Sequence, residues 1–463
     1  MQQIKSKKCK VHIFLFIMFL TVSTTFLPCR SFAGDMEILL DKLVNKGILT
    51  KPEADELLKE MNETKEMEKG KTEAQKPKTE IEATKTEEKK AESPEWVKNL
   101  PEWIKNPPEW IKNTKFAGDL RLRYQYDDRE GSSDRNRGKF RWRLGAETKI
   151  IDDVTVGFGL ASGSGDPRGL DQTFDSSFSK DTLNINYAFA QYKPLQRLSL
   201  SGGKLKTNPI FRANSLGSWP SELLWDNDIT PEGVAVVLNY PALLNLDVIG
   251  LDVFLNNAFF ILDENNPSGS GREPYMYVIQ PGFNLGIMKD INFKVALAYY
   301  MFSGIKNKLQ LKYSSKSNTF VGNNYVFDYN ALAATAEFGF KNPFNLEIIP
   351  YVGLFGEYVY NPDPEHNNKG YLGGIRLGHP YIKKFGDWQL QYAYRRLEKD
   401  AWLDVLTDST FYGGATNVKG HRGSIFFGLA KNLVFDINYF HSVNILDLKK
   451  PEDLLQVDIQ FNF

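Results

Sequence analysis

The chain has 463 residues, a length that allows about three average domains or one large β-architecture. Lysine plus arginine and aspartate plus glutamate each number 57, so no basic excess points to a nucleic-acid partner. The mean hydropathy of -0.38 is too polar for a bundle of membrane helices. Aromatic residues make up 13% and glycines number 36, which is typical of many twisted strands, and we therefore expect a large β-protein.

Residues 1–33 have the pattern of a secretory signal peptide. A basic stretch is followed by an apolar run over 11–27, and Ala33 ends a short small-residue cleavage site. Two alternatives stay open, a retained N-terminal anchor and a lipoprotein acylated at Cys29. Cleavage after residue 33 removes Cys29 and Cys9, so the exported chain is expected to use neither disulfides nor thiolate metal sites, and we expect no metal and no cofactor.

Three segments precede the main domain and are expected to lie in the periplasm. Residues 34–61 indicate a short helical hairpin, because an apolar stripe ends at Gly47 and capping-box spacing follows. Residues 62–93 are mostly Glu and Lys and indicate a solvated linker. Residues 94–114 contain three PEW[VI]KN repeats, which are either amphipathic turns for the membrane boundary or a duplicated spacer. Whether the hairpin binds the cell wall or self-associates is left open.

From residue 115 to 463 the pattern changes to alternation with a period of two. In the last run, Leu455, Val457 and Ile459 share one face while Gln456 and Asp458 share the other. Sixteen such runs are predicted, near 115–126, 139–150, 153–163, 182–193, 196–206, 232–240, 245–256, 275–286, 291–302, 327–340, 345–358, 371–378, 386–397, 419–430, 433–443 and 453–463.

The connections between these runs alternate in length, short after even-numbered strands and mostly long after odd-numbered ones. This is typical of a membrane barrel with short periplasmic turns and long external loops. We therefore predict an all-β transmembrane protein, a closed antiparallel β-barrel of about 16 strands with 14 to 18 possible, set in outer-membrane lipid. Pro281 and Pro350 fall inside predicted strands, where each removes a ladder donor.

The residues Gly118-Asp-Leu-Arg-Leu-Arg-Tyr124, the N-terminal hairpin ahead of a charged linker, and the terminal Phe463 resemble the putative porin family of Gram-negative outer membranes. The resemblance implies a water-filled channel for passive diffusion of small hydrophilic solutes or ions. It also implies a homotrimer, an external loop folded into the lumen, and Phe463 as the signal read by the outer-membrane assembly machinery. The alternative is a structural or adhesive barrel tethered through its N-terminal region.

Parity along the strands predicts which charged side chains face the lumen. Eight basic and eight acidic residues face inward, so bulk charge predicts no strong ion selectivity. Two neighbouring strands nevertheless carry a basic cluster that either forms one side of a constriction or braces the wall with Asp119 and Glu147. The predicted pore-lining residues are Arg121, Arg123, Arg141, Arg143, Arg376, Arg395 and Arg422.

The longest connection, 207–231, is predicted to be the constriction loop. Its large apolar side chains would expose too much surface in water, so it is expected to fold inward. There, Asp226 and Asp228 would face the basic cluster and create a transverse field, with Arg212 and Trp219 on the same loop. The alternative is a loop that folds over the rim or toward a neighbouring subunit.

Catalytic patterns are weak, and we expect no enzyme. His366, His379, His421 and His441 are scattered, without a metalloprotease motif or a neighbouring triad. His421 and Ser424 lie on one predicted strand with opposite parity, so they should face opposite sides of the wall.

Overall fold

The computed structural model describes residues 107–215, 221–264, 273–447 and 450–463. The predicted signal peptide, hairpin, linker and first two repeats lie outside these residues. By internal contacts the chain divides into units 1–95 and 96–463, and the described residues lie in the second. The third repeat lies at its start, where Pro108 precedes a single turn of helix, α6 (Glu109–Lys112).

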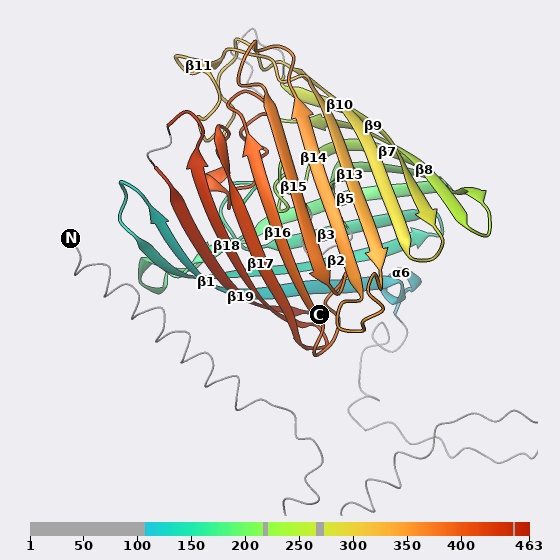
Figure 1. Ribbon diagram of the computed structural model, residues 1–463. Helices are drawn as coiled ribbons and strands as arrows, with labels where there is room; N and C mark the ends of the chain where they lie inside the picture. Colours follow the sequence, from blue (N-terminus) through green and yellow to red (C-terminus); the bar gives the residue numbers. More distant parts are fainter. Residues whose placement is uncertain (1–106, 216–220, 265–272, 448–449) are drawn as a thin grey trace, which may run out of the picture. The chain divides into compact units, whose positions relative to one another are not determined.

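Sixteen strands form one closed antiparallel barrel (Figure 1). Each pairs with the next along the wall, and the last pairs with the first, for example Arg121 with Gln460. The strands are β1 (Thr114–Arg129), β2 (Arg135–Ile151), β3 (Val154–Ala161), β5 (Asn184–Leu195), β6 (Leu198–Lys204), β7 (Glu232–Asn245), β8 (Ile249–Ile261), β9 (Tyr275–Ile287), β10 (Ile291–Ser303), β13 (Ala331–Lys341), β14 (Tyr351–Tyr360), β15 (Lys369–Gly378), β16 (Trp388–Leu397), β17 (Val418–Ala430), β18 (Leu433–Asn444) and β19 (Glu452–Asn462). The prediction of a sixteen-stranded barrel is confirmed.

Most connections alternate in length as the sequence predicts, but the one after β1, expected to be long, is only 130–134, because β1 and β2 extend into it. One end of the barrel carries short turns such as 152–153 and 431–432, together with the C-terminus. The other end carries the long connections, of which 162–183, 205–231 and 398–417 matter below. In Figure 1 the long-loop end lies at the top, near the label β11, and the short-turn end lies at the bottom.

The wall has an apolar outer face and a mostly polar inner face. Leu297 on β10 is 59% exposed and points outward, whereas its neighbour Ala298 is buried on the inner side. On β1 the inward Arg121 and Arg123 are buried, and the outward Leu122 between them is exposed. Alternation of this kind lets one strand meet lipid on one side and polar groups on the other.

Several local features differ from the predicted pattern. Pro350 lies outside the wall, because the turn 342–350 contains Asn342 and Asn345 at positive φ and β14 begins only at Tyr351. Pro281 does lie within β9, where it is the register partner of Leu255. Short elements in the connections are β4 (Gln172–Thr173), η1 (Ser176–Phe178), β11 (Phe320–Val321), β12 (Asn324–Tyr325) and η2 (Tyr412–Gly414). Among the described residues, no helix has the length and apolar character needed to cross a membrane.

The two chain ends of the barrel meet at its seam. The backbone N–H of Gly118 on β1 donates to the Phe463 carbonyl at 2.8 Å, and the Phe463 N–H donates back at 3.0 Å. A Cβ on residue 118 would lie 2.5 Å from the Phe463 ring, so glycine is needed for this close approach.

Candidate functional site: a basic ladder and two inward loops

The connection 205–231, which we name the first inward loop, lies inside the barrel over its described residues, 205–215 and 221–231. Its backbone N–H groups at Phe211 and Ala213 donate to the inward side chains of Gln280 (2.8 Å) and Glu357 (3.0 Å) on β9 and β14. These bonds satisfy loop groups that would otherwise be buried without partners. The loop is therefore attached to the inner wall at several strands.

The same loop is also held by apolar packing against the second long connection and against β10. The connection 398–417, the second inward loop, contributes Trp402, whose indole N–H donates to the Leu224 carbonyl at 2.7 Å. Trp402 also packs edge-on against Tyr300 of β10, with ring centroids 4.7 Å apart, and Trp225 lies against the same wall. Trp225 and Trp402 are both almost fully buried, so the two loops and this part of the wall share one apolar core.

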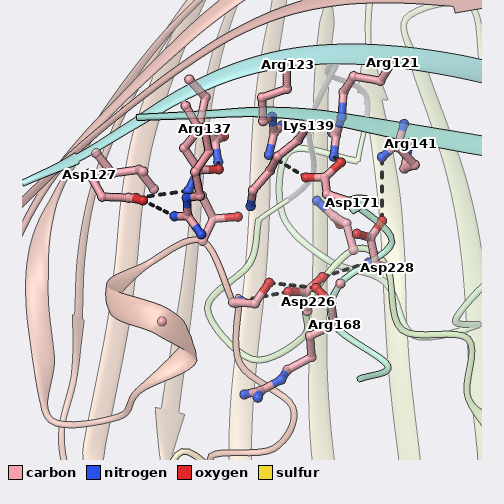
Figure 2. Close-up of a pocket in the computed structure, with 18 of the residues that line it drawn as sticks. Arg121, Arg123, Asp127, Arg137, Lys139, Arg141, Arg168, Asp171, Asp226 and Asp228 are labelled. Carbon is pink, nitrogen blue, oxygen red and sulfur yellow. Dashed lines mark hydrogen bonds and ion pairs between the residues drawn. The ribbon is translucent and has the colours of Figure 1, made fainter. Parts of the chain in front are cut away.

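The basic ladder comes from β1 and β2. Antiparallel register places Arg121 opposite Arg141, and Arg123 opposite Lys139, all on the inner face. A period of two sets each second residue of a strand on the same side, which is why four cations gather here. Figure 2 shows the ladder along the cavity wall, with Arg137 continuing it.

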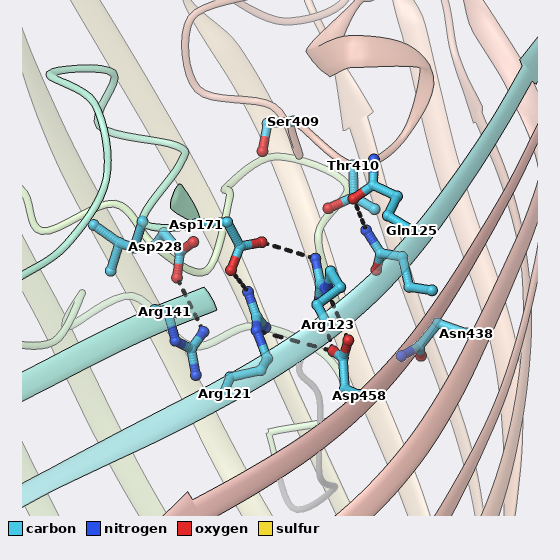
Figure 3. Close-up of polar contacts among 12 residues, drawn as sticks. Arg121, Arg123, Gln125, Arg141, Asp171, Asp228, Ser409, Thr410, Asn438 and Asp458 are labelled. Carbon is cyan, nitrogen blue, oxygen red and sulfur yellow. Dashed lines mark hydrogen bonds and ion pairs between the residues drawn. The ribbon is translucent and has the colours of Figure 1, made fainter. Parts of the chain in front are cut away.

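The acid that faces this ladder is Asp171, carried by the connection 162–183. Its carboxylate accepts from Arg121 at 2.6 Å and from Arg123 at 2.9 Å, and Arg123 also donates to Asp458 of β19 at 2.6 Å (Figure 3). Burial opposes ionisation of Asp171, but the two guanidinium groups outweigh it and hold the pKa of this carboxyl well below its usual range. Asp171 therefore stays ionised.

The remaining rungs pair with other carboxylates. Asp119 accepts from Arg141 at 2.8 Å and from Arg143 at 2.6 Å, so this part of the ladder braces the wall. The other brace that we considered, Glu147, pairs instead with Lys206 of the first inward loop.

The two predicted acids of the first inward loop differ in their contacts. The Asp228 carboxylate lies 3.7 Å from Arg141, across the cavity. The Asp226 carboxylate accepts from the backbone N–H groups of Asp228 and Ser409. Burial, together with neighbouring Asp228 and Asp408, raises the pKa of Asp226 well above its usual range.

These groups line a cavity of about 700 Å³ at the long-loop end, which we name the first cavity (Figure 2). Its basic lining residues are Arg121, Arg123, Arg129, Arg135, Arg137, Lys139, Arg141, Arg143, Arg168 and Arg212. Its acidic lining residues are Asp127, Asp171, Glu222, Asp226, Asp228 and Glu452. The basic side chains thus outnumber the acidic ones.

Two further cavities lie toward the short-turn end. The second, of about 540 Å³, shares Arg212 and Asn227 with the first. The third, of about 530 Å³, shares Lys206 and Asn239 with the second and reaches the turn residue Arg197. The first cavity therefore adjoins the second, and the second adjoins the third. Residues of the first inward loop line the boundary between the first and the second.

Three predicted pore-lining arginines lie elsewhere on the inner wall. Arg376 donates to the Asn214 side chain at 2.8 Å, Arg395 donates to the Glu222 carbonyl at 3.1 Å, and Arg422 lies 3.3 Å from the Glu222 carboxylate. They point inward, but the first inward loop covers them. Trp219 lies outside the described residues.

Sequence reasoning missed Asp171 and the second inward loop. Parity could have added Arg137 and Lys139 to the ladder, because they alternate with Arg141 on the same strand. Asp171 lies in a connection without any period, so no comparable signal exists for it.

The histidine geometry follows the predicted parity. His421 is exposed on the outer face, where it contacts the Tyr392 hydroxyl at 2.6 Å, and Ser424 is buried on the inner face. Among the residues that the structure describes, no group of three or more His, Cys, Asp or Glu side chains is arranged to hold a metal ion.

The fold and the lined cavities define a class, a transmembrane β-barrel with a polar interior path. A sequence profile of the family described as "Putative porin" matches residues 126–325 and 317–463. The chain therefore belongs to the putative porin family and is an outer-membrane channel for passive diffusion of small hydrophilic solutes or ions. This membership does not favour the alternative of a structural or adhesive barrel.

Comparison with solved structures gives matches at low identity. Pseudomonas putida OprB matches at 12% identity with a TM-score of 0.49, over 78% of this chain and 97% of that one. Salmonella typhi OmpF matches at 11% identity and 0.46, over 76% and 97%. A triple mutant of the Rhodopseudomonas blastica porin matches at 12% and 0.39, over 76% and 100%. No curated protein sequence matches this chain, so the assignment rests on the family profile and the barrel itself.

Proposed function

We propose that the three adjoining cavities are consecutive parts of one solute path, and that the first inward loop narrows this path where Arg212 and Asn227 stand. The observation that carries the proposal is that these two residues line both the first and the second cavity. The long-loop end would then be the external entrance and the short-turn end the periplasmic exit.

The packing of the loop supports a fixed constriction. Its second described part is held by the buried Trp225 and by the hydrogen bond from Trp402 to Leu224. Large buried aromatic side chains contribute strongly to local stability, and their loss costs about 3 to 5 kcal/mol. A loop fixed in this way would keep the width of the solute path constant while a solute passes.

We further propose the surroundings of this channel. Residues 34–114 would extend into the periplasm, since the described chain enters β1 at the short-turn end. Resemblance to sixteen-stranded porins supports a homotrimer in outer-membrane lipid, which sedimentation in detergent would test. The terminal position of Phe463 on the seam supports its role as the signal for the assembly machinery.

Single-channel recording in planar bilayers tests the constriction. Trp402→Ala removes the bond to Leu224 and the contact with Tyr300, so the loop should loosen and the conductance should rise. Trp142→Ala is the matched control, because Trp142 lies on β2 with outward parity and lines none of the three cavities. Unchanged conductance in folded Trp402→Ala would refute the assignment of the constriction to this loop.

A further inference from the structure

Three of the ten basic side chains of the first cavity stand apart from the rest. Seven have a carboxylate within 4.0 Å, which leaves Arg135, Lys139 and Arg212 without an ion pair among the described residues. Arg135 is exposed at the start of β2, where water solvates it. Lys139 and Arg212 lie deeper, and each of them lines the path.

Lys139 has no ion-pair partner among the residues that the structure describes, because the nearby acids already pair with the neighbouring arginines. It stands opposite Arg123 in the register of β1 and β2, and Arg123 already holds Asp171 and Asp458. Its side chain is half-buried between Arg137 and Arg141 on the same face. A cation removed from water in the company of other cations is costly unless an anion joins it.

Arg212 occupies the junction of the first and second cavities. Its guanidinium donates to the Trp225 carbonyl at 3.4 Å, and this long bond is its one hydrogen bond to the described residues, so several of its five N–H donors have no partner among them. A guanidinium presents a planar fork that matches a carboxylate or a phosphate in two parallel bonds. A passing oxyanion would meet this fork where the first cavity joins the second.

The acids near Arg212 offset it less than their number suggests. Glu222 and Asp226 both line the first cavity. Burial, with Asp408 as the next cause, raises the pKa of Glu222 well above its usual range, and the pKa of Asp226 is raised as well. A raised pKa disfavours the charged form of a carboxyl and so weakens its repulsion of an anion.

We propose that Lys139 and Arg212 are two successive binding positions for small oxyanions, carboxylates or phosphate, so that the channel favours anions. The hydroxyl group of Thr410 lines the same cavity and can donate to such a ligand. The inference rests on the proposed solute path through these cavities. The equal number of basic and acidic inward side chains predicts no strong ion selectivity. The inference instead assigns selectivity to the two cations that have no ion pair among the described residues.

Bilayer recording of the full-length protein tests this inference, with inorganic phosphate and acetate as separate probes. In potassium chloride the wild-type channel should prefer chloride, and millimolar phosphate should reduce the chloride current. Lys139→Gln should lower the chloride-to-potassium permeability ratio by about threefold, as Coulomb's law gives for a unit charge some 5 to 10 Å from an ion in water. Arg212→Gln should act in the same direction.

Two further variants make the result specific. Lys149→Gln removes the same charge from the same strand, but Lys149 is exposed and lines none of the three cavities, so selectivity should stay as in the wild type. Lys139→Arg keeps the charge and should keep the block by phosphate. Inhibition by phosphate without inhibition by acetate would restrict the ligand to phosphate.

The outcomes separate this inference from the proposed function. Stable currents that prefer cations, or that ignore both phosphate and acetate, would overturn the anion positions and leave the channel intact. An equal loss of selectivity in Lys149→Gln would assign the effect to overall charge and also overturn them. Absence of any step current in correctly folded protein would instead refute the solute path itself.

Discussion

Asp171→Asn tests whether the Asp171 carboxylate stabilises the basic ladder and whether it influences the ion selectivity of the channel. Asp171 accepts from Arg121 at 2.6 Å and from Arg123 at 2.9 Å, and its side chain is only 13% exposed. Breaking a fully buried ion pair costs about 3 to 5 kcal/mol, but Arg123 would keep Asp458, and Asp171 borders the first cavity instead of a closed core. We therefore expect a loss of about 1 to 3 kcal/mol in the free energy of unfolding.

The assay is denaturant unfolding of the barrel in lipid vesicles, with Asp175→Asn as the control. Asp175 is exposed on the same connection, so the same chemical change there should leave the unfolding midpoint unaltered. The pH dependence has a defined sign. Because the pKa of Asp171 is held below its ordinary value of about 4, its contribution is present above that pH and declines as the solution becomes strongly acidic.

Asp171→Asn should abolish that acid-dependent part of the stability and should increase preference for anions, since a lumen carboxylate is gone. A midpoint equal to that of the wild type, together with unchanged selectivity, would show that Asp171 neither supports the ladder nor shapes the field across the path.

Three other outcomes are expected. Val236→Arg on the outer face should cost about 2 to 4 kcal/mol near the bilayer midplane, while Val237→Arg, which faces the second and third cavities, should cost less than about 1; equal costs by vesicle unfolding would contradict the assignment of faces. The preference for anions should fall as the pH rises and Glu222 loses the proton that its raised pKa favours, and Glu222→Gln should flatten this response; a flat wild-type profile contradicts it. Phe463→Asp should lower the amount of heat-modifiable barrel in the membrane, and normal assembly would remove its role as a signal.

The barrel could be predicted because each strand carries its own signal. Alternation such as Leu455, Gln456, Val457 and Asp458 follows from a wall with lipid on one side and polar groups on the other, and the structure keeps that parity. The boundary at Pro350 was wrong because a turn and a strand end can share the same apolar residues. Local propensity does not say where pairing stops.

The candidate site was less predictable. Arg121 and Arg141 could be placed on one face from parity, but their partners depend on connections that fold back from distant parts of the chain. Asp171 reaches the ladder across 48 to 50 positions of sequence, and no period marks it. The second inward loop was missed because Trp402 lies in a connection that has no regular pattern.

The two inward loops divide the barrel wall into unequal halves. Strands β14 to β16 present Glu357, Arg376, Gln391 and Arg395 to the loops, whereas β1 and β2 line the first cavity with cations that mostly pair with carboxylates. One side of the wall therefore supports the loops, and the other side borders the solute path. Substitutions among the cavity-lining residues of β1 and β2 can change which solutes pass, while the opposite strands still hold the loops in place. Permeability can therefore diverge among relatives without a change of architecture.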